Sequence, residues 1–113
     1  MQRTLTLWSY QIQADTCAIY PMRGSNLYYP ALGLAGEAGE VCNKIKKIMR
    51  DKEGKMESAD IMALRDELGD VLWYVAALCS ELRLDMGAVA EANLDKLFSR
   101  KDRGKLGGSG DTR

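Results

Sequence analysis

The stretch DELGDVLWYVAAL, residues 66–78, decides the fold because its apolar residues recur every three or four positions. This period matches one face of an α-helix, whereas a half-buried strand alternates every second residue. The same period continues on both sides, so the predicted helix begins at a cap, Ser58 or Asp60, and extends to about Leu82. Its apolar stripe comprises Ile61, Leu64, Leu68, Val71, Val75, Leu78 and Leu82.

Three further segments show the same helical period. The first covers about 5–20, with Thr4 or Thr6 as its N-cap, and ends at Tyr20-Pro21. The second starts near Pro30, a good first-turn residue, and extends to about residue 50. The last begins at the cap Asp85 and extends to about residue 100.

The order of these segments predicts an all-α fold. No window alternates apolar and polar residues for long enough to suggest a sheet, so the simplest architecture is a four-helix bundle-like domain over 1–101. Residues 102–113 are basic and glycine-rich, which predicts a flexible C-terminal tail. A lone domain of 113 residues buries only about two-thirds of its unfolded surface, so association with further copies is favoured.

The composition excludes several classes of function. Lys plus Arg equals Asp plus Glu, 16 each, so there is no net field to hold a nucleic-acid polymer or an anionic membrane. No stretch approaches the roughly 20 apolar residues of a membrane helix. The three cysteines, Cys17, Cys42 and Cys79, are predicted to be buried thiols in a reducing cytoplasm. Histidine is absent, which removes the usual zinc ligand and histidine-based nucleophilic catalysis.

Two acidic pairs with one spacing, Glu37-x-x-Glu40 and Glu67-x-x-Asp70, interrupt the apolar helices. Residues three apart share a helix face, so each pair places two carboxylates at the edge of an apolar stripe. If the two helices form an antiparallel hairpin, the pairs face one another. Two carboxylates about 5 Å apart repel by roughly 3 kcal/mol at an effective dielectric constant of about 20, so four need a counter-charge. A hard, oxygen-bound cation, Mg²⁺ or Mn²⁺, supplies it.

Alternative roles for the polar residues stay open. The acids are solvated surface groups if Lys44, Lys47 or Arg65 neutralises them. Lys44 itself suits either a phosphate contact or a surface ion pair. Asn93, Lys96 and Arg100 form a polar stripe on the last helix that suits an anionic ligand or plain solvent. Trp8 and Tyr74 can stack on a base, although aromatic residues at helical spacing more often belong to the core.

Glycine is costly inside helices, at roughly 1 kcal/mol relative to alanine. Gly33, Gly36, Gly39 and Gly69 nevertheless fall within the predicted helices. The close approach of another backbone or of a ligand explains such positions, and for Gly33 a bend at the helix start explains it equally well.

The paired motifs resemble those of the MazG-like, all-α nucleoside triphosphate pyrophosphohydrolases. The resemblance rests on Gly36-Glu37-Ala38-Gly39-Glu40-Val41 followed by Asp66-Glu67-Leu68-Gly69-Asp70-Val71. It also covers Asn93-Leu94-Asp95-Lys96-Leu97 and Lys101-Asp102-Arg103-Gly104, and so spans most of the chain.

The resemblance implies a MazG-type domain completed by oligomerisation, as a homodimer or homotetramer. It implies Mg²⁺, replaceable by Mn²⁺, on the metal-binding and catalytic residues Glu37, Glu40, Glu67 and Asp70. The implied reaction converts a (deoxy)nucleoside triphosphate to the monophosphate and pyrophosphate, in nucleotide-pool control or house-cleaning. By the same analogy the substrate-binding residues are Lys44, Asn93, Lys96 and Arg100 for phosphate or sugar, with Trp8, Gln11 and Tyr74 near the base.

The alternative from another class is a non-catalytic helical oligomerisation or nucleotide-sensing module, in which the acids bind only cation or solvent. Within the family, phosphoribosyl-ATP pyrophosphatase and dUTPase are further alternatives. The spacing alone does not choose between Glu37 and Glu40 as the group that takes a proton from the attacking water.

Overall fold

The computed structural model describes residues 3–113 and contains four helices in that range, with no strand. They are α1 (Leu7–Asp15), α2 (Tyr28–Lys52), α3 (Ser58–Glu81) and α4 (Met86–Asp102). The all-α prediction is therefore confirmed. Of the domain predicted over 1–101, residues 1 and 2 lie outside the described residues.

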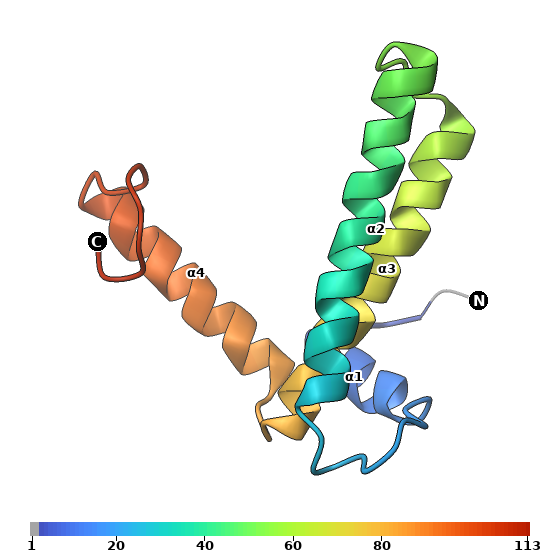
Figure 1. The fold of residues 1–113 in the computed structure, drawn as a ribbon. Helices are drawn as coiled ribbons and strands as arrows, with labels where there is room; N and C mark the ends of the chain where they lie inside the picture. Colours follow the sequence, from blue (N-terminus) through green and yellow to red (C-terminus); the bar gives the residue numbers. More distant parts are fainter. Residues whose placement is uncertain (1–2) are drawn as a thin grey trace.

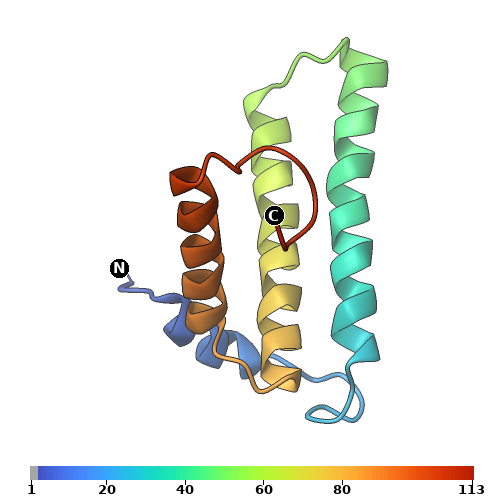
Figure 2. The same ribbon diagram turned by 90° about the vertical axis from the view of Figure 1, so that its left-hand side faces the viewer.

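Helices α2 and α3 form a long antiparallel hairpin, and α1 packs across the end of α3 farthest from the connecting turn (Figure 1). Helix α4 leaves that end at a wide angle and stands clear of the hairpin along most of its length, as the same view shows. Figure 2 shows α2, α3 and α4 in a second view, with the tail beyond α4. Within one chain the four helices thus do not close into a bundle.

The ends of the helices follow from their caps. The predicted cap Thr6 is confirmed for α1: its hydroxyl accepts a hydrogen bond from the Ser9 N–H at 3.0 Å, and Ser9 caps in return. The predicted extent to about residue 20 is wrong, because single turns replace the helix after Asp15. Ile19, within the predicted extent of the helix, is 94% exposed.

The predicted start of the second helix near Pro30 is confirmed: α2 begins at Tyr28, so Pro30 lies in its first turn, and the Asn26 side chain accepts a hydrogen bond from the Tyr29 N–H at 3.1 Å. The predicted cap of the third helix is corrected. Helix α3 is capped by Glu57 and not by Ser58 or Asp60. Asp60 is instead the reciprocal partner, accepting from the Glu57 N–H at 3.0 Å. The predicted cap Asp85 of α4 is confirmed.

The core is small and lies where α1, α3 and α4 meet. Ala76, Cys79 and Met86 are buried there, with Tyr10 and Val75 packed against them. Cys79 is a buried thiol as predicted, but the prediction is wrong for Cys17 and Cys42, which are exposed in the single chain. None of the described helices is long and apolar enough to cross a membrane.

The corner between α3 and α4 is fixed by the side chain of Gln11. Its Nε2 donates to the Leu84 carbonyl at 2.9 Å and to Ser80 Oγ at 3.1 Å, while its Oε1 accepts from the Met86 N–H at 2.7 Å. Gln11 is only 4% exposed. The corner also contains Arg83 at a positive φ of 58°, an uncommon conformation for a residue with a side chain.

Candidate metal centre

The two acidic pairs lie on adjacent helices of the hairpin and converge on one place. One carboxylate oxygen from each of Glu37, Glu67 and Asp70 lies within 4.8 Å of the others. Glu37 comes from α2 and the other two from α3, so the antiparallel packing itself assembles the group. Glu40, one turn farther along α2, is exposed and does not belong to this group of three.

The electrostatics of Glu37 show how tightly the acids are crowded. Hydrogen bonding to Glu67 raises the pKa of Glu37 most, and partial burial and the charges of Asp70, Glu67 and Glu40 raise the pKa further. The other three predicted acids thus all act on the carboxyl group of Glu37. A raised pKa means that the cluster favours added positive charge, as a proton or as a cation.

The donor chemistry of the cluster fits a hard divalent cation. The three converging ligand atoms are carboxylate oxygens, which are the ligands that Mg²⁺ and Mn²⁺ prefer. Glu37 and Glu67 are half-buried, while Asp70 is open to solvent. A cation held by these residues would therefore keep an open side for water and for a ligand.

Lys44 is the nearest positive charge to the cluster. Its Nζ lies 3.7 Å from Glu67 Oε1, and about a third of its side chain is exposed. At that distance it partly neutralises Glu67, which is the surface role that the sequence left open for it. The phosphate role that the family analogy gives Lys44 stays a prediction.

A cavity of about 200 Å³ continues from Lys44 along the hairpin, away from the acids. Lys47 also lines this cavity, one turn beyond Lys44. At its far end Lys52 is held by Asp60, with Nζ to Oδ2 at 2.9 Å. Lys47 has no ion pair among the described residues. The cavity is therefore lined by an unpaired ammonium group, that of Lys47, next to the ammonium group of Lys44, which pairs with Glu67.

Aromatic side chains border the cluster at the other end. Tyr74 lies against Gly33, where a Cβ would come 2.1 Å from its ring, so the close approach of a side chain explains this glycine. Burial raises the pKa of Tyr74 most, and Tyr29, Glu37 and Asp70 raise the pKa further, which places its hydroxyl near the acids. Burial, and then Asp70, likewise raises the pKa of Tyr10. Neither Tyr10 nor Tyr29 was predicted from the sequence, because neither belongs to a motif.

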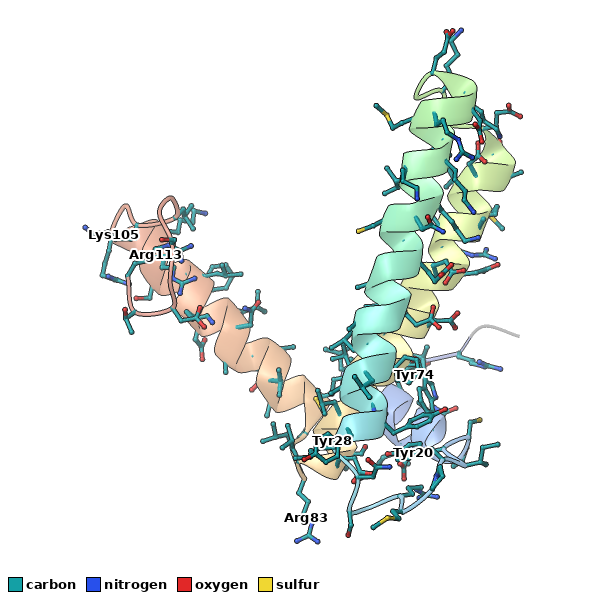
Figure 3. The ribbon with its side chains drawn as sticks, viewed as in Figure 1. Tyr20, Tyr28, Tyr74, Arg83, Lys105 and Arg113 are labelled. Carbon is teal, nitrogen blue, oxygen red and sulfur yellow. The ribbon has the colours of Figure 1, made fainter. Side chains whose placement is uncertain are left out.

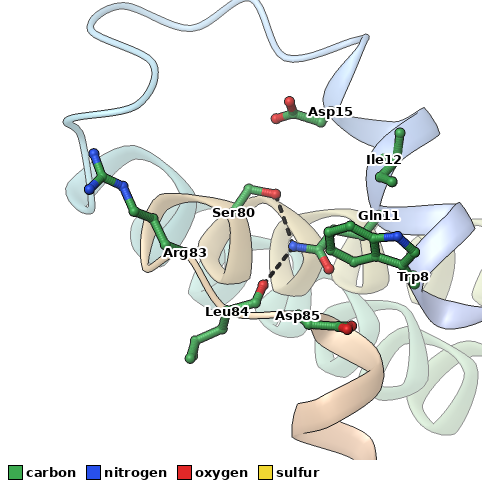
Figure 4. A pocket seen from close by; sticks show the side chains of 8 residues that line it. All are labelled: Trp8, Gln11, Ile12, Asp15, Ser80, Arg83, Leu84 and Asp85. Carbon is green, nitrogen blue, oxygen red and sulfur yellow. Dashed lines mark hydrogen bonds between the residues drawn. The ribbon is translucent and has the colours of Figure 1, made fainter.

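Trp8 and Gln11, predicted near the base, line a separate cavity of about 460 Å³ at the α3–α4 corner (Figure 4). The lining includes Ser80, ten residues beyond Asp70 on α3 and so about 15 Å from it along the helix axis. The amide of Gln11 is already used in fixing the corner. In the single chain neither residue reaches the acidic cluster, although Trp8 is half exposed.

The three predicted residues of α4 are likewise not brought to the acids. Asn93 is exposed, and Lys96 and Arg100 lie toward the free end of α4, where both contact Asp111 of the tail. Asp111 was not predicted from the sequence. The signal that could have found it is an acid within the basic, glycine-rich sequence that follows α4, where Asp111 is the only acid in 103–113.

The segment between α1 and α2 is held by Glu81, which was not predicted from the sequence either. Its Oε1 accepts hydrogen bonds from the Tyr20 hydroxyl at 2.7 Å and from the Gly24 N–H at 2.8 Å. The Tyr20 ring stacks on Tyr29, with ring centroids 4.6 Å apart. The segment between α1 and α2 is therefore tied to the end of α3, next to the aromatic border of the cluster.

Comparison with known proteins agrees with this geometry. The chain is 50% identical over 109 residues to the Gene 37 protein of Mycobacterium phage L5. The aligned region covers 92% of this chain and 96% of the phage protein. No solved structure matches the chain significantly. The model of the MazG nucleotide pyrophosphohydrolase domain matches residues 29–104, which include both acidic pairs. The chain therefore belongs to the MazG nucleotide pyrophosphohydrolase family.

Proposed function

We propose that the protein is a Mg²⁺-dependent pyrophosphohydrolase that converts a (deoxy)nucleoside triphosphate to the monophosphate and pyrophosphate. The observation that carries the proposal is the convergence of Glu37, Glu67 and Asp70 from two helices, with Lys44 beside them. Membership of the family supports the class of reaction. The proposed cation is Mg²⁺, with Mn²⁺ able to substitute, on these three acids and Glu40.

When bound, the cation would lower the pKa of a water molecule and offset the charge that develops on the phosphates. The water oxygen attacks the α-phosphorus, the bond from that phosphorus to the α–β bridging oxygen breaks, and pyrophosphate leaves with the electron pair. The water proton passes to a carboxylate, for which Glu37 and Glu40 are the candidates.

We assign the phosphates that leave to two lysines of α2. Lys44 lies beside the acids, and Lys44 and Lys47 line a cavity that continues along the hairpin, so a triphosphate bound at the acids can extend its distal phosphates toward them. Tyr74 at the opposite border suits a contact with the nucleoside. Asn93, Trp8 and Gln11 require a different chain or another arrangement to reach the same ligand.

The active form that we propose is a homodimer or homotetramer in the cytoplasm. Support comes from apolar side chains that stay open in the single chain on three helices, among them Ile45, Leu68 and Phe98, at 41%, 56% and 55% exposure. A second copy would cover these side chains and complete the bundle. The two exposed thiols suit a reducing compartment.

The decisive experiment incubates the purified protein with Mg²⁺ and a panel of nucleoside triphosphates and measures pyrophosphate release. Glu67→Gln and Asp70→Asn should each lower turnover at least about a hundredfold, because each removes a charge from the cluster. Asp66→Asn is the matched control, since that exposed acid pairs only with Arg65 on the same helix. Circular dichroism should show unchanged helical content in all three variants.

Near-full turnover in either cluster variant would falsify the carboxylate site. If the wild-type protein binds nucleoside triphosphates but leaves every one intact, the protein is the non-catalytic sensing module. Including dUTP and phosphoribosyl-ATP among the substrates separates the remaining options, because dUTPase and phosphoribosyl-ATP pyrophosphatase activity would each be confined to one of these two compounds.

A further inference from the structure

The segment 16–27, which joins α1 to α2, is held to α3 by a single carboxylate. Glu81 is the last residue of α3, and its Oε1 accepts hydrogen bonds from the Tyr20 hydroxyl at 2.7 Å and from the Gly24 N–H at 2.8 Å. Its Oε2 accepts from the Asn26 N–H at 3.4 Å. Among the described residues, every hydrogen bond between this segment and α3 ends on Glu81. Removing this one side chain therefore releases the segment from α3.

Packing gives the segment little further support. Ile19 and Met22 are exposed, so neither side chain is covered. Tyr20 is the only large apolar side chain of the segment that is buried. A cavity of about 130 Å³, lined by Glu81 and Tyr20 among others, lies at this contact. The place of the buried Tyr20 ring thus depends on its hydrogen bond to Glu81.

A row of three tyrosine rings leads from this contact toward the acidic cluster. The Tyr20 ring stacks on that of Tyr29, with centroids 4.6 Å apart and planes inclined by 9°. The Tyr29 ring in turn lies beside that of Tyr74, with centroids 6.3 Å apart and planes tilted by 45°. Both separations are in the range in which aromatic rings attract one another. Figure 3 labels the outer two, Tyr20 and Tyr74, near the start of α2. A shift of Tyr20 therefore disturbs Tyr29 and, through it, Tyr74.

Tyr74 ends the row at the acids. It follows Glu67 by seven residues and Asp70 by four on α3, so the three side chains share one helix face. Its ring also lies against Gly33 of α2, one turn before the acid that α2 contributes. Tyr29 is 44% exposed, so the row presents ring surface to solvent beside the acids. Such a surface suits the nucleoside of a ligand whose phosphates are held at a cation.

The charge of Glu81 is too far from the cluster to act on it directly. Glu81 lies eleven residues beyond Asp70, which is about 16 Å along the axis of α3. Charges on a protein surface are largely screened beyond about 8 Å at physiological ionic strength. Any effect of Glu81 on a ligand at the acids must therefore pass through the contacts of the row.

We propose that Glu81 is a positioning residue for the nucleoside of the ligand: through its hydrogen bond with Tyr20 it fixes the rings of Tyr29 and Tyr74 beside the acidic cluster. This role rests on the proposed function, because the ligand concerned is the proposed nucleoside triphosphate. Glu81 touches neither the cation nor the phosphates. Its loss should therefore weaken the hold on the nucleoside and leave the acids in place.

The test compares ligands that have a nucleoside with one that has none. Calorimetry in the presence of Mg²⁺ measures the Kd of inorganic tripolyphosphate and of the α,β-methylene analogues of dATP, dCTP, dGTP and dTTP, which the proposed reaction cannot cleave. Glu81→Ala should weaken binding of the tightest analogue roughly tenfold, because the rings lose their anchor, and binding of tripolyphosphate less than about twofold. Where hydrolysis is observed, KM for the triphosphate should rise by the same factor, with kcat changed less than about twofold.

Three further variants separate position from charge and from stability. Glu81→Gln keeps Oε1 as the acceptor for Tyr20 and Gly24, so the analogue should bind within about twofold of wild type. Tyr20→Phe keeps the ring but removes the hydrogen bond, and it should weaken analogue binding about threefold even if Glu81→Ala does not fold. Tyr28→Phe is its matched control, since Tyr28 is 81% exposed, and should change binding less than about twofold.

The positioning role is overturned if Glu81→Ala weakens tripolyphosphate as much as the analogue, if Glu81→Gln weakens the analogue as much as Glu81→Ala, or if Tyr28→Phe matches Tyr20→Phe. It is also overturned if the wild-type protein binds none of the analogues. Its failure is distinct from that of the proposed hydrolysis. Intact triphosphates together with the expected binding changes would end the hydrolysis and keep the role. Hydrolysis together with an unaltered analogue Kd in Glu81→Ala would do the reverse.

Discussion

The α2–α3 hairpin and helix α4 hold their charged side chains by opposite means. In the hairpin, like charges are crowded by the packing of two long helices, and Glu37 responds with a raised pKa. On α4, unlike charges are brought together by a tail that folds over an otherwise isolated helix. The comparison teaches that a crowding of acids suited to a cation is built into the packing of the hairpin, whereas the ion pairs of α4 depend on a contact with the tail.

The largest expected effect is a loss of stability in the α2–α3 hairpin. Gly33→Ala places a methyl group 2.1 Å from the Tyr74 ring, so the ring must move and the hairpin loses about 3 kcal/mol of unfolding free energy. Gly36→Ala is the matched control, since nothing lies within 4 Å of its Cβ. It should instead gain up to about 1 kcal/mol in helix propensity. Urea denaturation followed by circular dichroism measures both.

Equal stabilities for these two variants would show that Tyr74 does not press on α2 in solution. A loss at Gly36→Ala as large as that at Gly33→Ala would show something else. A neighbouring chain would then approach α2 at Gly36, as an oligomer allows.

The next largest effect concerns the corner between α3 and α4. Gln11→Ala leaves the Met86 N–H and the Leu84 carbonyl without their partner, which should cost about 2 kcal/mol of unfolding free energy. Gln13→Ala removes only an exposed hydrogen bond within α1 and should cost less than about 0.5 kcal/mol. If the corner depends on Gln11, amide exchange should rise around residues 84–88 and stay unchanged in the middle of the hairpin. An equal rise of amide exchange in the α2–α3 hairpin and in α4 would contradict this role of Gln11.

The smallest effect depends on pH and on Glu81. Burial alone would raise its pKa, but the hydrogen bonds from Tyr20, Gly24 and Asn26 prevail and keep the pKa below 4.5, the ordinary value. A lowered pKa contributes stability above the unfolded-state value and loses it as the pH falls through the folded-state value. The segment 16–27 should therefore loosen as the pH falls below about 4.5, at a cost of at most about 1 kcal/mol.

Glu81→Gln should remove this pH dependence while leaving that of the acidic cluster. Amide NMR signals of residues 16–27, recorded between pH 6 and pH 3, distinguish the two. An unchanged titration in Glu81→Gln would mean that another acid holds the segment.

The sequence was sufficient for the parts whose signal is periodic. The helical period predicts α2 and α3, and the matching spacing of Glu37 and Glu67 predicts that the two helices bring acids together. The extent of α1 was wrong because the residues after Asp15 are held by tertiary contacts, such as the hydrogen bond from the Tyr20 hydroxyl to Glu81 Oε1. Periodicity carries no information about such partners.

A second limit is that the sequence pattern does not give the direction in which a helix leaves its neighbours. Nothing in the period of α4 tells that it departs from the hairpin, since that depends on the conformation of Arg83 and on hydrogen bonds from Gln11. The contact of Asp111 with Arg100 is equally hidden, because it joins residues whose local patterns are unrelated. The placement of Asn93, Trp8 and Gln11 against a ligand stays a prediction for the same reason.

The corner at Arg83 makes α4 a lever. A helix of 17 residues is about 25 Å long, so a 10° change at the corner sweeps its tip through about 4 Å. A substitution among residues 82–85 can thus reposition Lys96 and Arg100 by more than the length of a hydrogen bond without touching either of them. Substitutions that change the position of the C-terminal end of α4 are therefore expected among residues 82–85.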